Sequence, residues 1–299
     1  MDLNLDFLGA LMVNGVIIGT LYGVVAMSFV LIYKASQVVN FAQGEFLLIG
    51  AWVCWWILTD LQLPFVVSFL LTLAFMVAFG ILLQVVVLRP MIGEPTIAVI
   101  MVTIGLSLTF QALMKWIFGV SAQPFPRIFE TEVVTVLGLR VQTVYIVSMV
   151  VSVAIMIGFG LFFKYSRMGL AMRATAFDQQ AAQSMGVSVK QVFAMAWAIS
   201  ALVSAVAGVV VGVVNGVSSA LSLFGIKVFP AVILGGLDSV IGAVIGGLIV
   251  GLLENFAHYL DVEFLGWGNM ISVAPFYALI IILMIKPYGL FGTKDIERI

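Results

Sequence analysis

The chain has 299 residues, of which 63% are hydrophobic and only 9% are charged, and its mean hydropathy is +1.24. Because roughly a quarter of the residues of a soluble domain are charged, this composition excludes a soluble globular protein and indicates a polytopic membrane protein. The formal net charge of −1 decides little, because the placement of Lys and Arg between the spans sets the orientation of such a protein.

Apolar runs of about 20 residues, long enough to cross the hydrocarbon layer of a membrane, follow one another along the whole chain. They predict helices near residues 9–33, 39–58, 64–88, 96–118, 142–163, 190–215, 239–257 and 269–286, and a short or re-entrant helix near 223–236. We therefore expect an all-α, polytopic inner-membrane protein with about 8–9 transmembrane helices, built as a single domain over residues 1–299.

Basic residues orient these spans. If the polar stretch 164–190 faces the cytoplasm, alternate loops place nine of the thirteen Lys and Arg residues on that side: Lys34, Arg89, Lys164, Arg167, Arg173, Lys190, Lys286, Lys294 and Arg298. This bias satisfies the positive-inside rule. It predicts an N-terminus outside and a C-terminus inside, provided that the segment 223–236 crosses or re-enters the membrane.

The stretch 164–191 is polar and lies between two long apolar runs. Its Ala- and Gln-rich centre contains no proline and predicts one short helix over residues 170–185, ended by Gly186. Ser188 and Gln191 have the spacing of a capping box at the start of the next span. A helix at the membrane surface between two spans offers a docking surface for a partner; the alternative is a solvated loop helix.

Polar side chains inside spans are energetically expensive and mark candidate functional sites. The densest cluster is Asn40-Phe-Ala-Gln43-Gly44-Glu45, at the start of the second predicted span. A broken helix there would expose backbone groups and a carboxylate to a water-filled path. The alternative is that Glu45 lies at the membrane interface or pairs with Lys34.

Other polar residues in the spans favour structural roles. Gln84 and Gln111 predict hydrogen bonds between helices, whereas Lys115 and Glu254 lie near span ends, where long side chains reach toward water. Glycines recur at every fourth position in 15–23 and 208–216, and two further pairs with this spacing are Gly242 with Gly246 and Gly247 with Gly251. These small faces predict close helix packing, with a sliding or subunit-facing surface as the alternative.

Nothing in the sequence indicates catalysis. The single cysteine, Cys54, and the single histidine, His258, exclude a metal centre built from several such residues, and we expect no metal site. Gly235-Gly-Leu-Asp238 lacks the spacing of an intramembrane aspartyl protease, and there is no Gly-x4-Gly-Lys-Ser/Thr phosphate loop. We therefore expect no enzyme activity and no cofactor, with any ATP bound by separate chains.

Several motifs, in order along the chain, resemble those of one family. Val39-Asn-Phe-Ala-Gln-Gly-Glu45 is similar to the Asn-Phe-Ala-His-Gly-Glu signature of permeases in branched-chain amino acid ABC importers, with Gln43 in place of the usual histidine. Further matches are Leu88-Arg-Pro90, Gly105-Leu-Ser-Leu108, Met168-Gly-Leu-Ala-Met-Arg-Ala174, Leu234-Gly-Gly-Leu237 and Lys286-Pro-Tyr-Gly-Leu-Phe-Gly292. The similarity covers nearly the whole chain and is strongest to the smaller permease of the pair, the LivH type.

The resemblance implies a permease subunit of an ATP-driven importer in a bacterial or archaeal plasma membrane, with branched-chain or other hydrophobic amino acids as substrates. The implied partners are ABC ATPase subunits, a second permease of the LivM type, a periplasmic or extracellular solute-binding protein and membrane lipid, but no nucleic acid. The alternative is an ATP-independent channel or secondary carrier for a small solute such as urea or an amide. The residues alone do not select the solute.

The resemblance also assigns candidate residues. The substrate-path candidates are Asn40, Gln43, Gly44, Glu45, Gly235 and Gly236. Gln180-Ala-Ala-x3-Gly186 is similar to the Glu-Ala-Ala-x3-Gly coupling motif of importer membrane subunits, without its downstream Leu-Pro, and makes 164–190 the cytoplasmic coupling loop. The implied ATPase-coupling residues are Arg173, Ala174, Asp178, Gln180, Ala181, Ala182 and Gly186, with Arg173 placed to pair with an acidic group of the ATPase.

Overall fold

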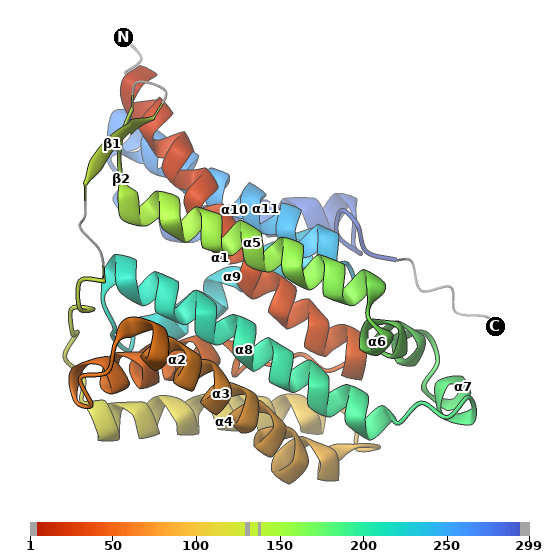
Figure 1. Ribbon diagram of the computed structural model, residues 1–299. Helices are drawn as coiled ribbons and strands as arrows, with labels where there is room; N and C mark the ends of the chain where they lie inside the picture. The colour runs from red at the N-terminus through yellow and green to blue at the C-terminus, as the bar shows by residue number, and fades with distance from the viewer. Residues whose placement is uncertain (1–4, 129–131, 137–138, 294–299) are drawn as a thin grey trace. The chain divides into compact units, whose positions relative to one another are not determined.

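The computed structural model describes residues 5–128, 132–136 and 139–293, and most of them lie in helices (Figure 1). The helices are α1 (Leu5–Ser36), α2 (Gln43–Thr59), α3 (Phe65–Leu83), α4 (Thr96–Phe118), α5 (Thr143–Tyr165), α6 (Arg167–Phe177), α7 (Gln179–Ser184), α8 (Val189–Asn215), α9 (Leu221–Gly235), α10 (Val240–Leu260) and α11 (Met270–Ile285). The π-helical turns η1 (Gln84–Leu88) and η3 (Asp261–Leu265) extend α3 and α10, and the 3-10 turn η2 (Arg89–Met91) follows η1.

Within the described residues, six helical segments are long and apolar enough to span a membrane: Phe7–Ser36, Phe65–Met91, Thr96–Phe118, Thr143–Tyr165, Val189–Asn215 and Val240–Leu265. The shorter apolar helices α2, α9 and α11 have 17, 15 and 16 residues. The predicted all-α polytopic fold, including a short helix near 223–236, is confirmed. Lys294 and Arg298, which the sequence places on the inner side, lie outside the described residues.

Most helix boundaries follow from breakers in the sequence. Pro64 and Pro95 cap the N-termini of α3 and α4, where a residue without an N–H is no loss because the first N–H groups of a helix have no intrahelical acceptor. The second predicted span is an exception, because α2 begins at Gln43 and not at residue 39. The Oδ1 atom of Asn40 accepts a hydrogen bond from the N–H of Ala42 at 3.1 Å, and this local turn competes with helix formation.

The polar stretch 119–141, which separates two predicted spans, contains a β-hairpin. Strands β1 (Val133–Val136) and β2 (Leu139–Gln142) pair antiparallel, with Val133 opposite Gln142 and Val136 opposite Leu139. Residues 129–131 and 137–138 of this stretch lie outside the described residues. The valine-rich run 133–136 has the β-branched composition of a strand, but it is short and lies in a polar stretch, so the strand was not predicted.

The chain divides into two compact units, and three of the four boundaries between them fall inside α1, α5 and α9, while the fourth lies between α4 and β1. The first unit comprises residues 1–27, 129–156 and 227–299 and the second comprises residues 28–128 and 157–226. The predicted single domain over 1–299 stays a prediction.

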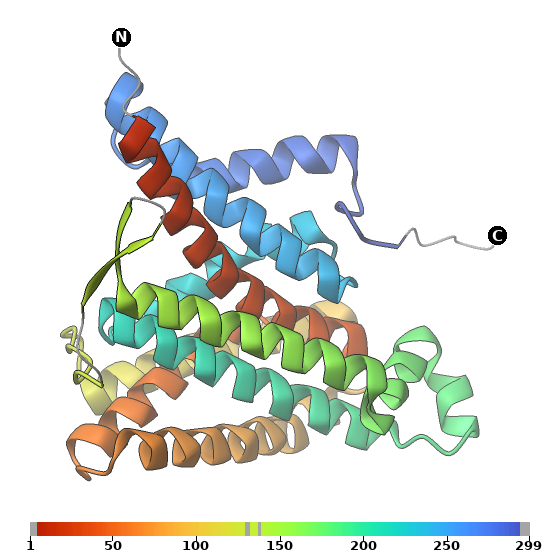
Figure 2. The same ribbon diagram turned by 45° about the horizontal axis from the view of Figure 1, so that its top comes forward.

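In the first unit, α10 and α11 lie side by side, and the N-terminal part of α1 packs on α10 (Figure 2). A Cβ atom added at Gly19 would lie 2.8 Å from the Cα of Leu248, and one added at Gly247 would lie 2.5 Å from the Cα of Gly23. The glycine faces of α1 and α10 therefore serve the predicted close packing, because only a residue without a side chain lets two backbones approach so nearly.

In the second unit, α8 is the central helix and packs against α2 and α3, and α2 also contacts α4 (Figure 1). Most of α8 is buried, whereas α3 and α4 expose large apolar side chains such as Leu82, Met101 and Leu108. Exposed apolar surface on a helix long enough to span a membrane is the surface that lipid or another membrane subunit covers.

Candidate functional site

The predicted polar cluster at the start of α2 forms one buried hydrogen-bond network, the amide cluster, made by Ser28, Asn40, Gln43, Ser200 and Ser204. The Nε2 atom of Gln43, which has two hydrogens to donate, lies within hydrogen-bond distance of the hydroxyl oxygens of all three serines, at 2.7, 3.1 and 2.5 Å in chain order. Asn40 Nδ2 donates to Gln43 Oε1 at 3.1 Å. All five residues are at most 2% exposed, so the network is buried and uncharged.

The serine partners of Gln43 were missed by the sequence analysis. Ser28 lies on α1, while Ser200 and Ser204 lie on α8, 157 and 161 positions from Gln43 along the chain. Their spacing of four residues places Ser200 and Ser204 on one face of a helix. This polar face in an apolar span is the sequence feature that could have indicated a buried hydrogen-bond network. The cluster joins α1, α2 and α8 through the one residue at which the chain departs from the Asn-Phe-Ala-His-Gly-Glu signature.

Glu45, the carboxylate of the predicted substrate path, is 4% exposed and accepts a hydrogen bond from Ser107 Oγ of α4 at 2.9 Å. Lys34, the alternative partner expected for it, has its Nζ atom 5.6 Å from the centroid of the Phe163 ring. Glu45 is thus a buried group bonded to α4, contrary to the alternative in which it lies at the membrane interface.

At Gly44 the backbones of α2 and the start of α9 approach closely. A Cβ atom at Gly44 would lie 2.2 Å from the carbonyl oxygen of Ser222, and one at Gly225 would lie 2.5 Å from the Cα of Gly44. Gln111 of α4 donates to Ser222 Oγ at 3.0 Å, which confirms the hydrogen bond between helices predicted for it. The start of α2 is therefore closed tightly by α9.

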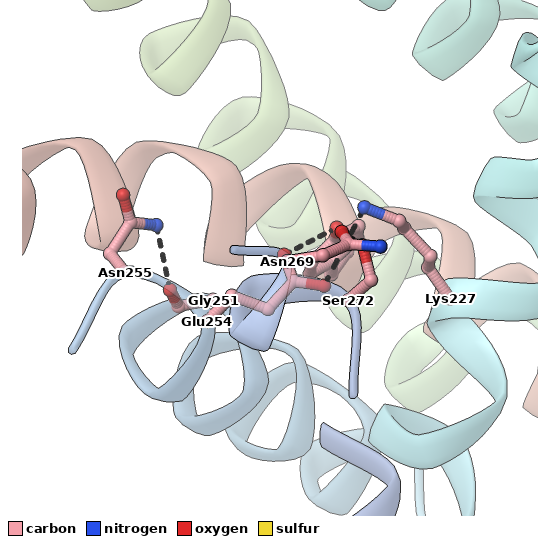
Figure 3. A network of polar contacts seen from close by, with 7 residues as sticks. Lys227, Gly251, Glu254, Asn255, Asn269 and Ser272 are labelled. Carbon is pink, nitrogen blue, oxygen red and sulfur yellow. Dashed lines mark hydrogen bonds and ion pairs between the residues drawn. The ribbon is translucent and has the colours of Figure 1, made fainter. Parts of the chain in front are cut away.

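A second polar network, the carboxylate cluster, lies in the first unit and consists of Tyr22, Lys227 and Glu254. Figure 3 shows Lys227 and Glu254. The Tyr22 hydroxyl donates to Glu254 Oε2 at 2.7 Å, and Lys227 Nζ lies 3.9 Å from Glu254 Oε1. Glu254 is 2% exposed, so the prediction that its side chain reaches toward water at a span end was wrong. The error arose because the ion pair joins α9 to α10, which the sequence alone does not bring together.

The polar stretch between α5 and α8 folds as two short helices and not as the single helix predicted over 170–185. The break is at Asp178, whose carboxylate accepts hydrogen bonds from the N–H groups of Gln180 and Ala181 at 2.8 and 2.9 Å and so caps α7. An aspartate at an N-cap satisfies N–H groups that a helix start leaves without partners, and here this favours a new helix over continuation of α6.

Gly186 ends α7 as predicted. Its φ is +85°, and the Gly186 N–H donates to the carbonyl of Gln183 while the Val187 N–H donates to that of Ala182. This pair of bonds is a Schellman motif, which needs a left-handed residue. Ser188 caps α8, but its side chain makes no capping hydrogen bond, so the predicted capping box with Gln191 is not formed.

Arg173 is directed at the chain's own α5. Its guanidinium donates to the carbonyl oxygens of Phe163 and Lys164 and lies over the Phe163 ring. A cation at the last carbonyls of a helix is favourable, and these bonds fasten α6 to α5. The predicted pairing of Arg173 with an acidic group of an ATPase stays a prediction.

The segment 167–186, which we name the coupling segment, exposes apolar side chains in a polar setting. Phe177 at the end of α6 is 94% exposed, and Met185 at the end of α7 is 86% exposed. Of the other predicted coupling residues, Asp178, Gln180 and Ala181 are exposed, whereas Ala182 is buried. Exposed apolar residues that flank a short polar helix are typical of a surface covered by a partner protein.

The sequence matches one protein family over residues 11–285: the branched-chain amino acid transport system / permease component. The chain belongs to this family. The permease is therefore a multi-pass protein of the plasma membrane, and the predicted resemblance is confirmed over nearly its whole length.

Curated relatives of the permease come from bacteria and archaea. The high-affinity branched-chain amino acid transport system permease proteins LivH of Salmonella typhimurium and Escherichia coli K12 are each 31% identical to it, with 96% of either chain covered. BraD of Pseudomonas aeruginosa is 29% identical, with 96% of this chain and 97% of BraD covered. Among solved structures, PsaBC from Streptococcus pneumoniae in complex with Fab has the same fold, with a TM-score of 0.51, 18% identity, and coverage of 95% and 94% of the two chains.

The permease brings two of its family motifs together at the turn between α9 and α10. The N–H groups of Leu290 and Phe291 donate to the carbonyls of Leu234 and Gly235, at 2.8 and 3.1 Å. A Cβ atom at Gly236 would lie 2.5 Å from the backbone nitrogen of Gly292. Gly235 and Gly236, predicted for the substrate path, thus occupy a turn on which the motif 286–292 packs; their role in the path stays a prediction.

Gln84 departs from the expected hydrogen bond between helices. Its side chain is 1% exposed, and its Nε2 atom has no hydrogen-bond partner among the residues that the structure describes. The residue opens the π-helical turn η1.

Proposed function

We propose that this chain is the membrane subunit of an ATP-driven importer that carries branched-chain or other hydrophobic amino acids. The family match over residues 11–285 supports this, together with the names of the LivH and BraD relatives. The ATP-independent channel or carrier is not favoured by these relatives, all of which are permease components of transport systems.

In this proposal the subunit binds no nucleotide itself. Two ATPase subunits hydrolyse ATP in the cytoplasm, a second permease of the LivM type completes the translocation path, and a solute-binding protein delivers substrate at the outer face. A transport cycle requires that the ATPase contact the permease differently in two states, because a partner that binds both states equally shifts nothing.

The observation that carries the proposal is the coupling segment. Phe177 and Met185 flank α7 with side chains that are 94% and 86% exposed, on a loop for which the distribution of Lys and Arg predicts a cytoplasmic location. Large apolar side chains of this kind bind well in pockets of a partner. The ATPase would bind α7 and these two side chains, while Arg173 and Gly169 hold α6 on the end of α5.

Asn40, Gln43, Gly44 and Glu45 are proposed for the translocation path. All but Gly44 carry polar side chains, and their positions at the start of α2 are buried. A buried polar group that loses its hydrogen-bond partner costs free energy unless a new partner replaces it. A polar solute in the path could be such a partner. The neutral Gln43 suits a path for solutes with no net charge.

Co-purification and uptake test the proposal together. The permease would be expressed with its ATPase subunits, second permease and binding protein, either as wild type or with Phe177→Ser and Met185→Ser combined. We expect the wild type to retain the ATPase subunits through purification and to drive ATP-dependent leucine uptake in proteoliposomes. The double variant should lose both the ATPase subunits and the uptake while remaining folded.

Trp267→Ser is the matched control, because Trp267 is 75% exposed but lies in the loop after α10, which the predicted orientation places outside. It should leave ATPase retention unchanged. Uptake of leucine by the purified permease without any ATPase would overturn the proposal.

A further inference from the structure

The second unit contains a cavity next to the coupling segment. Its volume is about 150 Å³, and it lies where the end of α1, the η1–η2 turns after α3, the start of α4 and the start of α8 meet. Gln179, the first residue of α7, contributes to its wall. Because the loops at Lys34 and Arg89 carry basic residues, the positive-inside rule places this cavity at the cytoplasmic end of the spans.

One wall of the cavity carries a hydrogen-bond donor in need of an acceptor. Gln84 lines the cavity, is 1% exposed, and has an Nε2 atom without a partner among the described residues. Leaving a buried hydrogen-bond donor unpaired costs free energy. A ligand that accepts a hydrogen bond from Gln84 would offset that cost. Gln84 also starts a π-helical turn, a rare distortion that is frequently found at functional sites.

The remaining walls suit a short apolar group and a cation. Val99, Phe193 and Trp197 are buried apolar residues that line the cavity, and the exposed carboxylate residue Glu94 lies at its edge. A cavity of about 150 Å³ holds a molecule the size of benzene, which is close to the side chain of a hydrophobic amino acid. A donor for a carboxylate, an acidic group for an ammonium and an apolar wall are thus present around one space.

We propose that this cavity is a second amino-acid site, which binds the imported class of solute from the cytoplasm and slows the transporter. The carboxylate of the solute would accept a hydrogen bond from Gln84, its ammonium would face Glu94, and its side chain would pack against Phe193 and Trp197. This inference rests on the proposed function, since it assigns the cavity the same solute class.

The position of Gln179 connects this site to ATP hydrolysis. Since Gln179 belongs to α7, a ligand that fills the cavity contacts the coupling segment and the spans at once. It therefore favours one position of α7 relative to α3 and α8, and a ligand that stabilises one state of a cycle slows passage to the other. High cytoplasmic solute would then reduce further uptake.

The test uses the complete importer in proteoliposomes whose ATPase subunits face outward, with the binding protein and isoleucine sealed inside. ATP and leucine are added outside, so that leucine reaches only the cytoplasmic face. We expect ATP hydrolysis by the wild type to fall by about 5-fold or more at saturating leucine, the size of a typical coupling between two sites. Gln84→Met keeps the length of the side chain but removes the donor, and should be insensitive to leucine.

A purely structural role for Gln84 predicts a different result. Because the Nε2 atom of Gln84 has no partner in the described part of the chain, Gln84→Met should leave the Tm of the ligand-free permease unchanged or raise it. Gln111→Met is the matched control, because Gln111 donates to Ser222; it should lower Tm but keep the inhibition by leucine. Val99→Phe fills the cavity and should abolish the inhibition without removing any polar group.

The outcomes separate this inference from the proposed function. If isoleucine-loaded binding protein stimulates ATP hydrolysis but outside leucine has no effect on the wild type, the second site does not exist and the importer assignment stands. Equal inhibition of the wild type, Gln84→Met and Val99→Phe would place the inhibitory site elsewhere and overturn the inference. If the binding protein fails to stimulate hydrolysis at all, the proposed function itself is wrong.

Discussion

The amide cluster and the carboxylate cluster place polar groups in membrane-spanning helices in opposite ways. Around Gln43, neutral donors and acceptors from three helices and from the turn before α2 satisfy one another at 2.5 to 3.1 Å. Around Glu254, one carboxylate oxygen accepts from Tyr22 at 2.7 Å, while the other faces Lys227 at 3.9 Å without a hydrogen bond from the described residues.

The two clusters thus differ in charge, because only the carboxylate cluster contains an ion pair. A neutral network loses only hydrogen bonds when one member is removed, whereas a buried ion pair leaves an uncompensated charge behind. The carboxylate cluster should therefore be the more sensitive of the two to single substitutions. In this cluster, a second substitution that removes the remaining charge should also restore stability. The stability of each variant below is measured as its free energy of unfolding in SDS titrations, followed by the fluorescence of the chain's six tryptophans.

Lys227→Met should have the largest effect, a loss of about 3 kcal/mol, because it leaves Glu254 charged, buried and unpaired. The value lies at the low end for such pairs since the Lys227 side chain is 37% exposed. Adding Glu254→Gln to this variant should restore most of the stability. A double variant no more stable than Lys227→Met alone would show that the charge of Glu254 is not the cause.

Gln43→Leu should cost about 2 kcal/mol, because Asn40 and the serine hydroxyls lose the partner that joins them and several remain buried. Gln43→His, which restores the residue of the family signature, keeps a donor and an acceptor and should cost less than about 1 kcal/mol. If both variants lose the same amount, the shape of Gln43 matters more than its hydrogen bonds.

Tyr22→Phe should cost about 1.5 kcal/mol, the lower value for a hydrogen bond to a charged group. The phenol of Tyr22 is the hydrogen-bond donor to Glu254 Oε2, and the ring itself remains in place in this variant. In the background of Glu254→Gln the same substitution should cost less, since the acceptor is then neutral. Equal costs in the two backgrounds would contradict a charge-assisted bond.

Asn14→Leu should have the smallest effect, about 0.6 kcal/mol, the average for a hydrogen bond between helices in a membrane. Asn14 Nδ2 donates to Asn255 Oδ1 at 3.0 Å, and Asn255 keeps a second bond, from its Nδ2 to the carbonyl of Gly251 at 2.9 Å (Figure 3). A loss larger than that of Tyr22→Phe would mean that neutral bonds hold α1 on α10 more strongly than the carboxylate cluster does.

The spans were predictable because their signals are local. The helix expected over 96–118 coincides with α4, between Pro95 and Gly119, and that over 190–215 differs from α8 by one residue. Apolar runs, prolines and glycines act over a few positions, and the membrane leaves helices as the only structure for such runs. The hairpin at 133–142 and the break at Asp178 were missed because short strands and caps give weaker signals than a span does.

The candidate site was predictable only in part. Asn40, Gln43 and Glu45 were identified because polar groups in an apolar run are conspicuous, but their partners were not. Tyr22 and Glu254 are 232 positions apart, and no local pattern reports which helices become neighbours. For the same reason Gln84 was expected to have a partner that the described residues do not provide.

The two ends of the coupling segment differ in how they are joined to the rest of the chain. The guanidinium of Arg173, the N-cap of Ser166 and the close contact of Gly169 with the Phe163 carbonyl tie α6 to α5. In contrast, α7 is bounded by an extended residue, Asp178, and a left-handed one, Gly186, so that rotation about the backbone at two positions is enough to reorient it. A movement of α6 would therefore move α5 with it. A movement of α7 would first change the backbone angles at Asp178 and Gly186, so α7 can adjust to a partner before α5 moves.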